Sequence, residues 1–409
     1  MPPTEDLPIV EVGPIAHGGH CVARLDGQVV FVRHALPGER VRIRVTERGR
    51  RFLRADAVEV LDPAPGRVAP PCRYAGTCGG CDFQHVDPAT QRALLTSVVR
   101  EQLDRLAGIT WDGEVEAVLP DDLGWRTRVT WAVDVDGRAG LRRHRSHDVV
   151  RVDACPIAHP DTVDVQLQRW DADRVETIVS STGQRMLVTD AGIDDPLEAR
   201  LRLDDADGVV AEDGTVRAGT KHLVERVHHR DFRVTGSGFW QVHPAAAETL
   251  VDAVLAGAAV RPGDRVVDLY AGVGLFTAFL AEAAGPTGEV VWVEADRGAA
   301  VDARANVADL PQVAVVPGRT ERVLRRGEAG EHADVVVLDP PRSGAKDAVA
   351  DVVALAPRRV VYVACDPAAL ARDLATFARL GYGLDALRGF ALFPMTHHVE
   401  CVAVLSARH

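Results

Sequence analysis

Hydrophobic and polar positions follow a different period in the first part of the chain than in the last. Residues 8–60 contain short runs in which apolar and polar residues alternate, and glycine turns such as Asp26-Gly27 and Pro37-Gly38 separate the runs. This pattern predicts a small closed β-barrel of the OB type over residues 1–62. The proline-rich segment 61–71 predicts a linker after it.

Helical and strand-like periods alternate in the rest of the chain. Asp87-Pro88 precedes apolar residues at helical spacing, which predicts a helix over 88–107. From about residue 244, buried strands such as "RVVDLY" and "RRVVYVAC" alternate with helices, which predicts an α/β domain with a parallel, doubly wound, Rossmann-like sheet. We therefore expect a barrel at 1–62, a central α+β domain at 63–235 and an α/β domain at 236–409.

The charge distribution is uneven. The chain of 409 residues has a net charge of −12, which argues against a generally basic nucleic-acid-binding protein. Arginines nevertheless gather at 40–54 and again at 141–151, and these stripes either bind phosphates or form solvated arginine-rich faces. Acidic residues gather at 190–214, and the sequence assigns that segment no role.

Membrane association is not expected. The N-terminus lacks a basic region followed by an apolar core, and the longest apolar stretch, 266–285, contains Asp268, Glu282 and several glycines. Seven cysteines without a secretion signal indicate a reducing compartment and metal or catalytic roles. We expect a cytoplasmic protein.

Three of the cysteines are closely spaced. Cys72, Cys78 and Cys81 lie in "CRYAGTCGGCDFQH", and Cys155 in "VDACPIAHP" is the nearest plausible fourth ligand. Four thiolates favour a metal site over disulfides or core thiols, and both an iron–sulfur cluster and zinc suit them. Four protein ligands leave no open iron for S-adenosylmethionine, so a structural or RNA-positioning role is expected.

A candidate cofactor pocket follows the strand that contains Asp268. Gly272 and Gly274 form a tight turn before a helix, and Glu294 ends the next strand, where an acid can bind ribose hydroxyls. The third glycine of a dinucleotide-binding fingerprint is replaced here by Leu275-Phe276, so pyrophosphate binding is disfavoured. Acids on both strands and a short glycine turn indicate S-adenosylmethionine, which is cationic; a generic glycine turn is the alternative.

Three further residues lie where predicted strands begin or end, at the same sheet edge. Asp339 begins "DPPRSG", Cys365 ends an apolar strand, and Glu400 precedes the strand "CVAVL". A thiolate that adds to uracil C6 makes C5 nucleophilic, and a base must later remove the C5 proton. Cys365 and Glu400 suit these roles, although a packed thiol, a helix-capping Asp339 and a solvated Glu400 are the alternatives. His397 and His398 either contact the substrate or are simply surface residues, and the sequence favours neither role.

These motifs together resemble the RNA 5-methyluridine (uracil-C5) methyltransferase family. The resemblance covers nearly the whole chain, in the form with a TRAM barrel and a four-iron cluster, and it is greatest to the 23S rRNA (uracil-5-)-methyltransferases. "YVACDPAALARDL" and "FPMTHHVECVAVL" carry it most specifically. It implies Cys365 as nucleophile and Glu400 as base, and it implies that helix 88–107 packs on the catalytic domain. Implied cofactor contacts are Gln241, Tyr270, Gly272, Gly274, Glu294 and Asp339, and implied [4Fe-4S] ligands are Cys72, Cys78, Cys81 and Cys155.

The sequence departs from the family pattern at Asp366 and His243, where the family has Asn, and at Leu275, where Asn is common. We expect a monomer that methylates C5 of a uridine in structured RNA, with ribosomal RNA favoured and transfer RNA as the alternative. A non-catalytic RNA-binding relative and a radical enzyme with a similar barrel are the other hypotheses.

Overall fold

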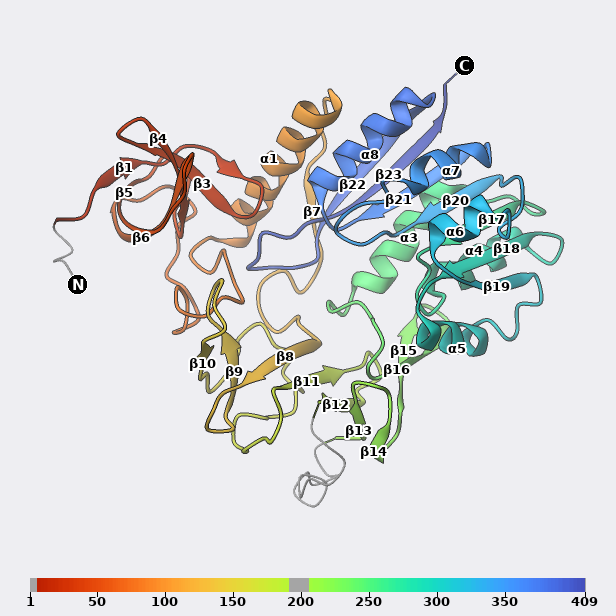
Figure 1. The fold of residues 1–409 in the computed structure, drawn as a ribbon, viewed down its shortest axis with the longest axis horizontal. Helices are drawn as coiled ribbons and strands as arrows, with labels where there is room; N and C mark the ends of the chain where they lie inside the picture. The colour runs from red at the N-terminus through yellow and green to blue at the C-terminus, as the bar shows by residue number, and fades with distance from the viewer. Residues whose placement is uncertain (1–5, 191–205, 409) are drawn as a thin grey trace.

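The computed structural model describes residues 6–190 and 206–408 (Figure 1). Residues 191–205 of the acidic segment 190–214 lie outside the described residues. The described chain forms an N-terminal barrel, a central sheet and a C-terminal α/β sheet. No helix of the described chain is long and apolar enough to cross a membrane.

Six strands form the barrel, in the order β1-β5-β6-β4-β3-β2. Valines and isoleucines that point inward fill it, among them Val30, Val32, Val41 and Ile43, which are fully buried. The alternation of buried and exposed residues along β5 is the period-two pattern of the sequence. The strands are β1 (Ile9–Glu11), β2 (Ile15–Ala16), β3 (His20–Leu25), β4 (Gln28–Arg33), β5 (Arg40–Arg48) and β6 (Phe52–Asp62).

Seven strands form the central sheet, in the order β10-β9-β8-β11-β12-β13-β14, and a separate hairpin, β15–β16, leads into the α/β region. Trp131 and Trp170 are buried in the core of this part. The strands are β8 (Arg128–Val133), β9 (Ala139–Arg142), β10 (Val149–Val150), β11 (Arg174–Val179), β12 (Arg185–Thr189), β13 (Gly208–Ala211), β14 (Val216–Gly219), β15 (His222–Val227) and β16 (Arg230–Thr235).

The C-terminal sheet has eight strands in the order β19-β18-β17-β20-β21-β23-β22-β7. Strands β17 to β21 are parallel, as the alternation of strands and helices predicted. Strand β23, which the alternation of strands and helices did not include, runs antiparallel to both β21 and β22. The short connection between β22 and β23 explains this, because a parallel pair requires a crossover of a dozen or more residues. The strands are β17 (Arg265–Leu269), β18 (Glu289–Glu294), β19 (Val313–Pro317), β20 (Val335–Leu338), β21 (Arg359–Ala364), β22 (Tyr382–Ala391), β23 (Glu400–Ala407) and β7 (Val115–Ala117).

Helices cover both faces of this sheet (Figure 1). Alternate strand residues face opposite sides: Val266 and Val361 pack with α3 and α4, whereas Val267 and Val360 belong to the core that includes α1, α7 and α8. Helix α1 packs against α8, and β7 pairs with β22, so residues 88–117 belong structurally to the C-terminal sheet. The helices are α1 (Pro88–Ala107), α3 (Ala246–Ala258), α4 (Leu275–Ala284), α5 (Arg297–Asn306), α6 (Thr320–Arg325), α7 (Ala348–Ala354) and α8 (Pro367–Arg379).

Candidate active site and cysteine site

The register between β21 and β23 places Cys365 beside Glu400. Ala364, the last residue of β21, pairs with Cys401. Because the two strands are antiparallel, Cys365, which follows Ala364, meets Glu400, which precedes Cys401, at the sheet edge. Burial raises the pKa of the Cys365 thiol to about 12, and the nearby carboxylates of Glu400 and Asp339 add to this effect. Cys401 is fully buried in the core, as expected.

Carboxyl groups gather around this edge. Asp339 follows β20, the strand next to β21, and burial raises its pKa to about 7, with Asp268 and Glu294 contributing. Glu400 is buried, and burial together with Asp339 raises its pKa well above the usual value. Four buried or half-buried acids so close together favour a cationic ligand, because a cation offsets their mutual repulsion.

Arg342 is a site residue that the sequence reasoning missed. It lies in the loop after Asp339-Pro340-Pro341, is exposed, and its charge lowers the pKa of both Cys365 and Glu400. The signal was present in "DPPRSG", because an arginine after a strand-end acid is a candidate anion contact. An arginine at this position favours the thiolate form of Cys365.

Two residues of the "YVACDPAALARDL" motif hold this loop in place. The Asp373 carboxylate on α8 accepts hydrogen bonds from the Tyr362 hydroxyl and the Ala345 backbone N–H, both at 2.7 Å. All three residues are buried. The strand that ends at Cys365 and the loop that contains Arg342 are therefore joined through one carboxylate.

The predicted cofactor turn has the expected geometry. Gly272 and Gly274 both have positive φ, 52° and 88°, which only glycine adopts without strain. The Gly272 N–H donates to the Glu294 carboxylate at 3.3 Å, so the turn and the acid on the next strand are adjacent. Tyr270, φ 59°, precedes the turn, and its hydroxyl donates to Glu321 at 3.3 Å.

Asp268 lies beneath this turn and is almost fully buried. Thr277 on α4 donates a hydrogen bond to one of its carboxylate oxygens, and the other oxygen, Oδ1, has no partner within the described residues. Burial raises the pKa of Asp268 to about 7. A buried carboxylate oxygen without a donor fits a site that a polar, cationic ligand completes.

The residue before Gln241 belongs to the same hydrophobic core as the residues of the cofactor turn. This residue, Trp240, packs in one core cluster with Val273 and Leu275. Leu275, a departure from the family pattern, is buried there at the start of α4. His243 is also buried: it stacks on Trp125 and its Nε2 lies 3.0 Å from the Pro120 carbonyl, so its contacts are structural.

The segment before Glu400 is held by the cysteine-rich loop. Asp82 follows Cys81 directly, and its carboxylate lies 2.6 Å from His397 Nδ1 and accepts from the His397 backbone N–H at 3.2 Å. The backbone N–H groups of Asp82 and Phe83 both donate to the Met395 carbonyl. His397 is therefore a connecting residue between two parts of the chain.

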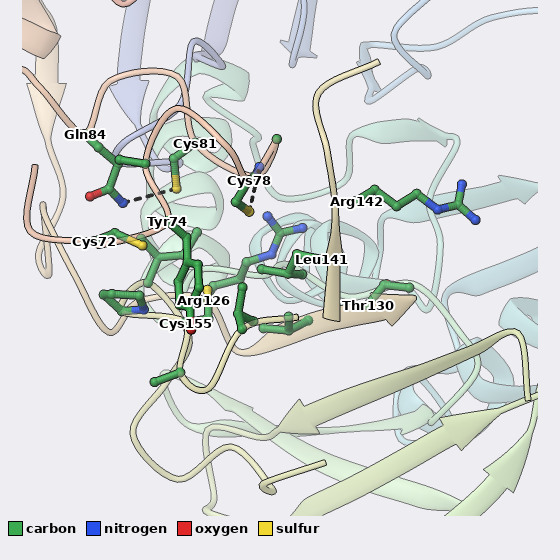
Figure 2. Close-up of a pocket in the computed structure, with 18 of the residues that line it drawn as sticks. Cys72, Tyr74, Cys78, Cys81, Gln84, Arg126, Thr130, Leu141, Arg142 and Cys155 are labelled. Carbon is green, nitrogen blue, oxygen red and sulfur yellow. Dashed lines mark hydrogen bonds between the residues drawn. The ribbon is translucent and has the colours of Figure 1, made fainter. Parts of the chain in front are cut away.

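The four predicted metal-ligand cysteines line one cavity of about 370 Å³ (Figure 2). Cys72, Cys78 and Cys81 come from the loop after the barrel, and Cys155 comes from a loop of the central region. Burial raises the pKa of Cys81 to about 12, and the three other thiols raise it further. A metal offsets this cost because it binds thiolates directly.

Hydrogen-bond donors and a cation face the thiols. Gln84 donates to Cys81 Sγ at 3.3 Å, and the Gly80 N–H donates to Cys78 Sγ at 3.4 Å. Burial lowers the pKa of Arg126, whereas the thiols of Cys155 and Cys81 raise it, and its guanidinium lies among the cysteines, whereas Arg142 points away (Figure 2). In the part of the chain that the structure describes, no group of three or more His, Cys, Asp or Glu residues is arranged to hold a metal ion.

The arginine stripe at 40–54 is partly neutralised. Arg40, Arg42 and Arg54 pair with the carboxylates of Asp62, Glu59 and Glu47 at 2.8 to 3.1 Å. Arg145, from the second basic segment, lies 3.6 Å from Glu47, so the two stripes meet. Arg54 also lies over the rings of two neighbouring phenylalanines on the barrel surface, Phe31 and Phe52.

The chain is similar to known proteins over most of its length. Residues 9–58 match the TRAM domain model, and residues 329–408 match the model of the tRNA (Uracil-5-)-methyltransferase family. An uncharacterized RNA methyltransferase of Streptomyces avermitilis is 49% identical over 97% of each chain. The 23S rRNA (uracil(1939)-C(5))-methyltransferase RlmD of Alkalilimnicola ehrlichii is 34% identical, over 98% of this chain and 97% of that protein.

A solved structure agrees with this similarity. The tRNA (uracil-54, C5)-methyltransferase of Pyrococcus abyssi, in complex with S-adenosyl-L-homocysteine, superposes with a TM-score of 0.72 at 25% identity, over 97% of this chain and 99% of that one. The barrel, the strand-end cysteine and the identity over almost the whole length lead to one conclusion. The chain belongs to the family of RNA (uracil-5-)-methyltransferases.

Proposed function

We propose that this protein transfers a methyl group from S-adenosylmethionine to C5 of a uridine in structured RNA. Cys365 acts as the nucleophile and Glu400 as the general base. The observation that carries the proposal is the strand register that puts both residues at one sheet edge, next to Asp339. Large-subunit ribosomal RNA is the favoured substrate, because the 23S rRNA enzyme is 34% identical to this chain and the tRNA enzyme 25%; transfer RNA is the alternative.

The chemistry assigns each residue a separate step. The Cys365 thiolate adds to uracil C6, which makes C5 nucleophilic enough to accept the methyl group. Bound S-adenosylmethionine supplies this group on a positively charged sulfur. Glu400 then takes the C5 proton, the C5=C6 double bond forms again, and the Cys365 sulfur leaves C6. The raised pKa of Glu400 makes its carboxylate a stronger base than it would be in water.

The cofactor pocket is assigned to the acids around the glycine turn. Asp268, Glu294 and Asp339 suit a ligand with a sulfonium and an amino group. Gly272 and Gly274 have no side chains, so the ligand can approach the backbone of the turn closely. The remaining proposed contacts are Gln241 and Tyr270. Arg342 would contact the uracil or the phosphate next to it, since its charge acts on both Cys365 and Glu400.

The target uridine must leave its stack to reach Cys365, as in other enzymes that act on bases. The barrel surface around Phe31, Phe52 and Arg54 offers aromatic rings and a guanidinium at one place. Such a surface suits the bases and phosphates that flank the target. Because Arg54 also pairs with Glu47, the rings contribute more to this surface than its charge does.

A labelling assay tests this proposal. The protein is incubated with methyl-labelled S-adenosylmethionine and with 23S rRNA or tRNA that lacks 5-methyluridine. Label is expected at uridine C5, with Cys365→Ala inactive and Glu400→Gln arrested as a covalent protein–RNA adduct. Cys21→Ala, which removes a buried barrel thiol, is the control and should retain activity. Absence of label, or full activity of Cys365→Ala, would refute the proposal.

We also propose that Cys72, Cys78, Cys81 and Cys155 hold a [4Fe-4S] cluster. Four thiolates on one zinc ion stand roughly 4 Å apart. The cavity of about 370 Å³ that the four cysteines line has room for the larger cluster. The N–H groups on sulfur and the Arg126 guanidinium suit its negative charge. Bound there, the cluster would link two distant loops.

Elemental analysis after anaerobic purification decides between the metals. Iron and acid-labile sulfide at about four per chain, with a broad visible absorbance, are expected from the chemistry of this cluster. Zinc at about one per chain without that absorbance would reverse the assignment.

A further inference from the structure

A turn of the barrel lies against the loop of the nucleophile. Residues 17–19 connect β2 to β3, and His17 Nε2 lies 3.0 Å from the Asp366 carboxylate. Asp366 follows Cys365 directly in the chain. Although 349 positions separate the two partners, one hydrogen bond therefore joins the barrel to the catalytic loop.

Asp366 uses its two oxygens for different partners. Oδ1 accepts from the Ala369 backbone N–H at 2.7 Å and caps helix α8, while Oδ2 faces His17. An asparagine could cap the helix equally well, but its amide nitrogen could only donate to an unprotonated Nε2, whereas the aspartate carboxylate accepts from a protonated Nε2 and adds the attraction of opposite charges when His17 is protonated. The pair with His17 thus gives a physical reason for aspartate at this position.

The same turn also touches the segment before Glu400. Gly19 has φ 77°, and a Cβ built on it would lie 2.7 Å from the His397 Cβ. His397 cannot retreat freely, because Asp82 holds its ring and its backbone N–H from the other side. Any side chain at position 19 must therefore displace either the barrel or the segment that leads to Glu400.

We propose that the barrel turn 17–19 is a positioning element of the active site. His17 sets the loop of Cys365, and the missing side chain of Gly19 lets the His397 segment close. The inference rests on the proposed function, because it assigns these roles relative to Cys365 and Glu400. The same turn sets the distance between RNA bound to the barrel and the nucleophile. His20, the residue after Gly19, contacts Phe31 on the proposed RNA-binding surface, so the turn joins that surface to the active site.

Two glycine variants test the contact at position 19. Gly19→Ala and Gly27→Ala place the same side chain at barrel turns with nearly equal φ, 77° and 81°, but a Cβ at Gly27 meets nothing within 4 Å. The two variants therefore have the same backbone strain from a positive φ. Methyl transfer should fall about tenfold to a hundredfold in kcat for Gly19→Ala only, because small displacements of reacting groups are costly. Equal activity of the two variants would overturn the proposal.

A double-mutant cycle tests His17 and Asp366. The readout is the rate at which Cys365 forms an adduct with RNA that contains 5-fluorouridine, since fluorine at C5 blocks the step of Glu400. His17→Ala and Asp366→Asn should each slow adduct formation, and the double variant should be no slower than the slower single variant. Asp252→Ala, which breaks the His228–Asp252 pair of the same 3.0 Å length, should leave the rate unchanged.

The outcomes separate the two proposals. A wild-type protein that transfers no label contradicts the proposed function itself. An active wild type with independent, additive effects at positions 17 and 366 contradicts only the positioning role. If Gly19→Ala does not fold, as thermal unfolding would reveal, the cycle still decides, because both of its residues are partly exposed.

Discussion

Replacement of Asp373 is expected to lower both the stability of the protein and its activity. Its carboxylate on α8 accepts from the Tyr362 hydroxyl and the Ala345 N–H, each at 2.7 Å, and it is buried. Asp373→Ala leaves the Tyr362 hydroxyl buried without an acceptor, whereas the Ala345 N–H keeps the Tyr362 oxygen at 3.1 Å as its partner. A buried donor without a partner costs about 1–3 kcal/mol, and the lost bond of the Ala345 N–H to a charged acceptor adds about 1.5–3 kcal/mol, which gives roughly 2.5–6 kcal/mol.

Part of this cost is offset, because the substitution also removes a buried charge. We therefore expect the free energy of unfolding to fall by about 2–4 kcal/mol for Asp373→Ala. Activity should fall as well, since the loop with Arg342 is no longer tied to the strand that ends at Cys365.

Urea unfolding followed by tryptophan fluorescence measures the loss, because Trp292 is buried in the same sheet. Tyr362→Phe removes one donor to a charged acceptor and should cost about 1.5–3 kcal/mol. Tyr382→Phe, whose hydroxyl donates to the neutral Pro357 carbonyl at 2.7 Å, is the matched comparison and should cost about 0.5–1.5 kcal/mol. A loss under about 1 kcal/mol for Asp373→Ala, with methyl transfer unchanged, would refute the reasoning.

Other consequences concern pH and metal. Burial raises the pKa of Asp268 and Asp339 to about 7, above the ordinary value of 3.8, so the ligand-free protein should lose stability as pH rises from about 4 to 7. Thermal unfolding across this range checks the sign, and a stability that rose would contradict it. The affinity for S-adenosylhomocysteine, measured by calorimetry, should weaken below pH 7 as both carboxylates become protonated. Cys155→Ser should lose bound iron, whereas Cys21→Ser, at a buried thiol of the barrel, should retain it.

The sequence by itself determined the elements and much of the candidate chemistry. Apolar runs such as 360–364 form strands wherever they are buried on both faces, and period-two alternation forms the barrel, because these patterns follow from local geometry. The ends of parallel strands share one edge, so Asp339 and Cys365 could be placed together without coordinates. The family resemblance then supplied the roles.

The tertiary structure decided what depends on contacts between distant segments. The antiparallel register of β23 puts Glu400 beside Cys365, and no local pattern reveals strand direction. Cys155 joins the other cysteines only through packing of the central region. The pairing of His17 with Asp366 links residues 349 positions apart, which explains why Asp366 looked like an unexplained departure in the sequence alone.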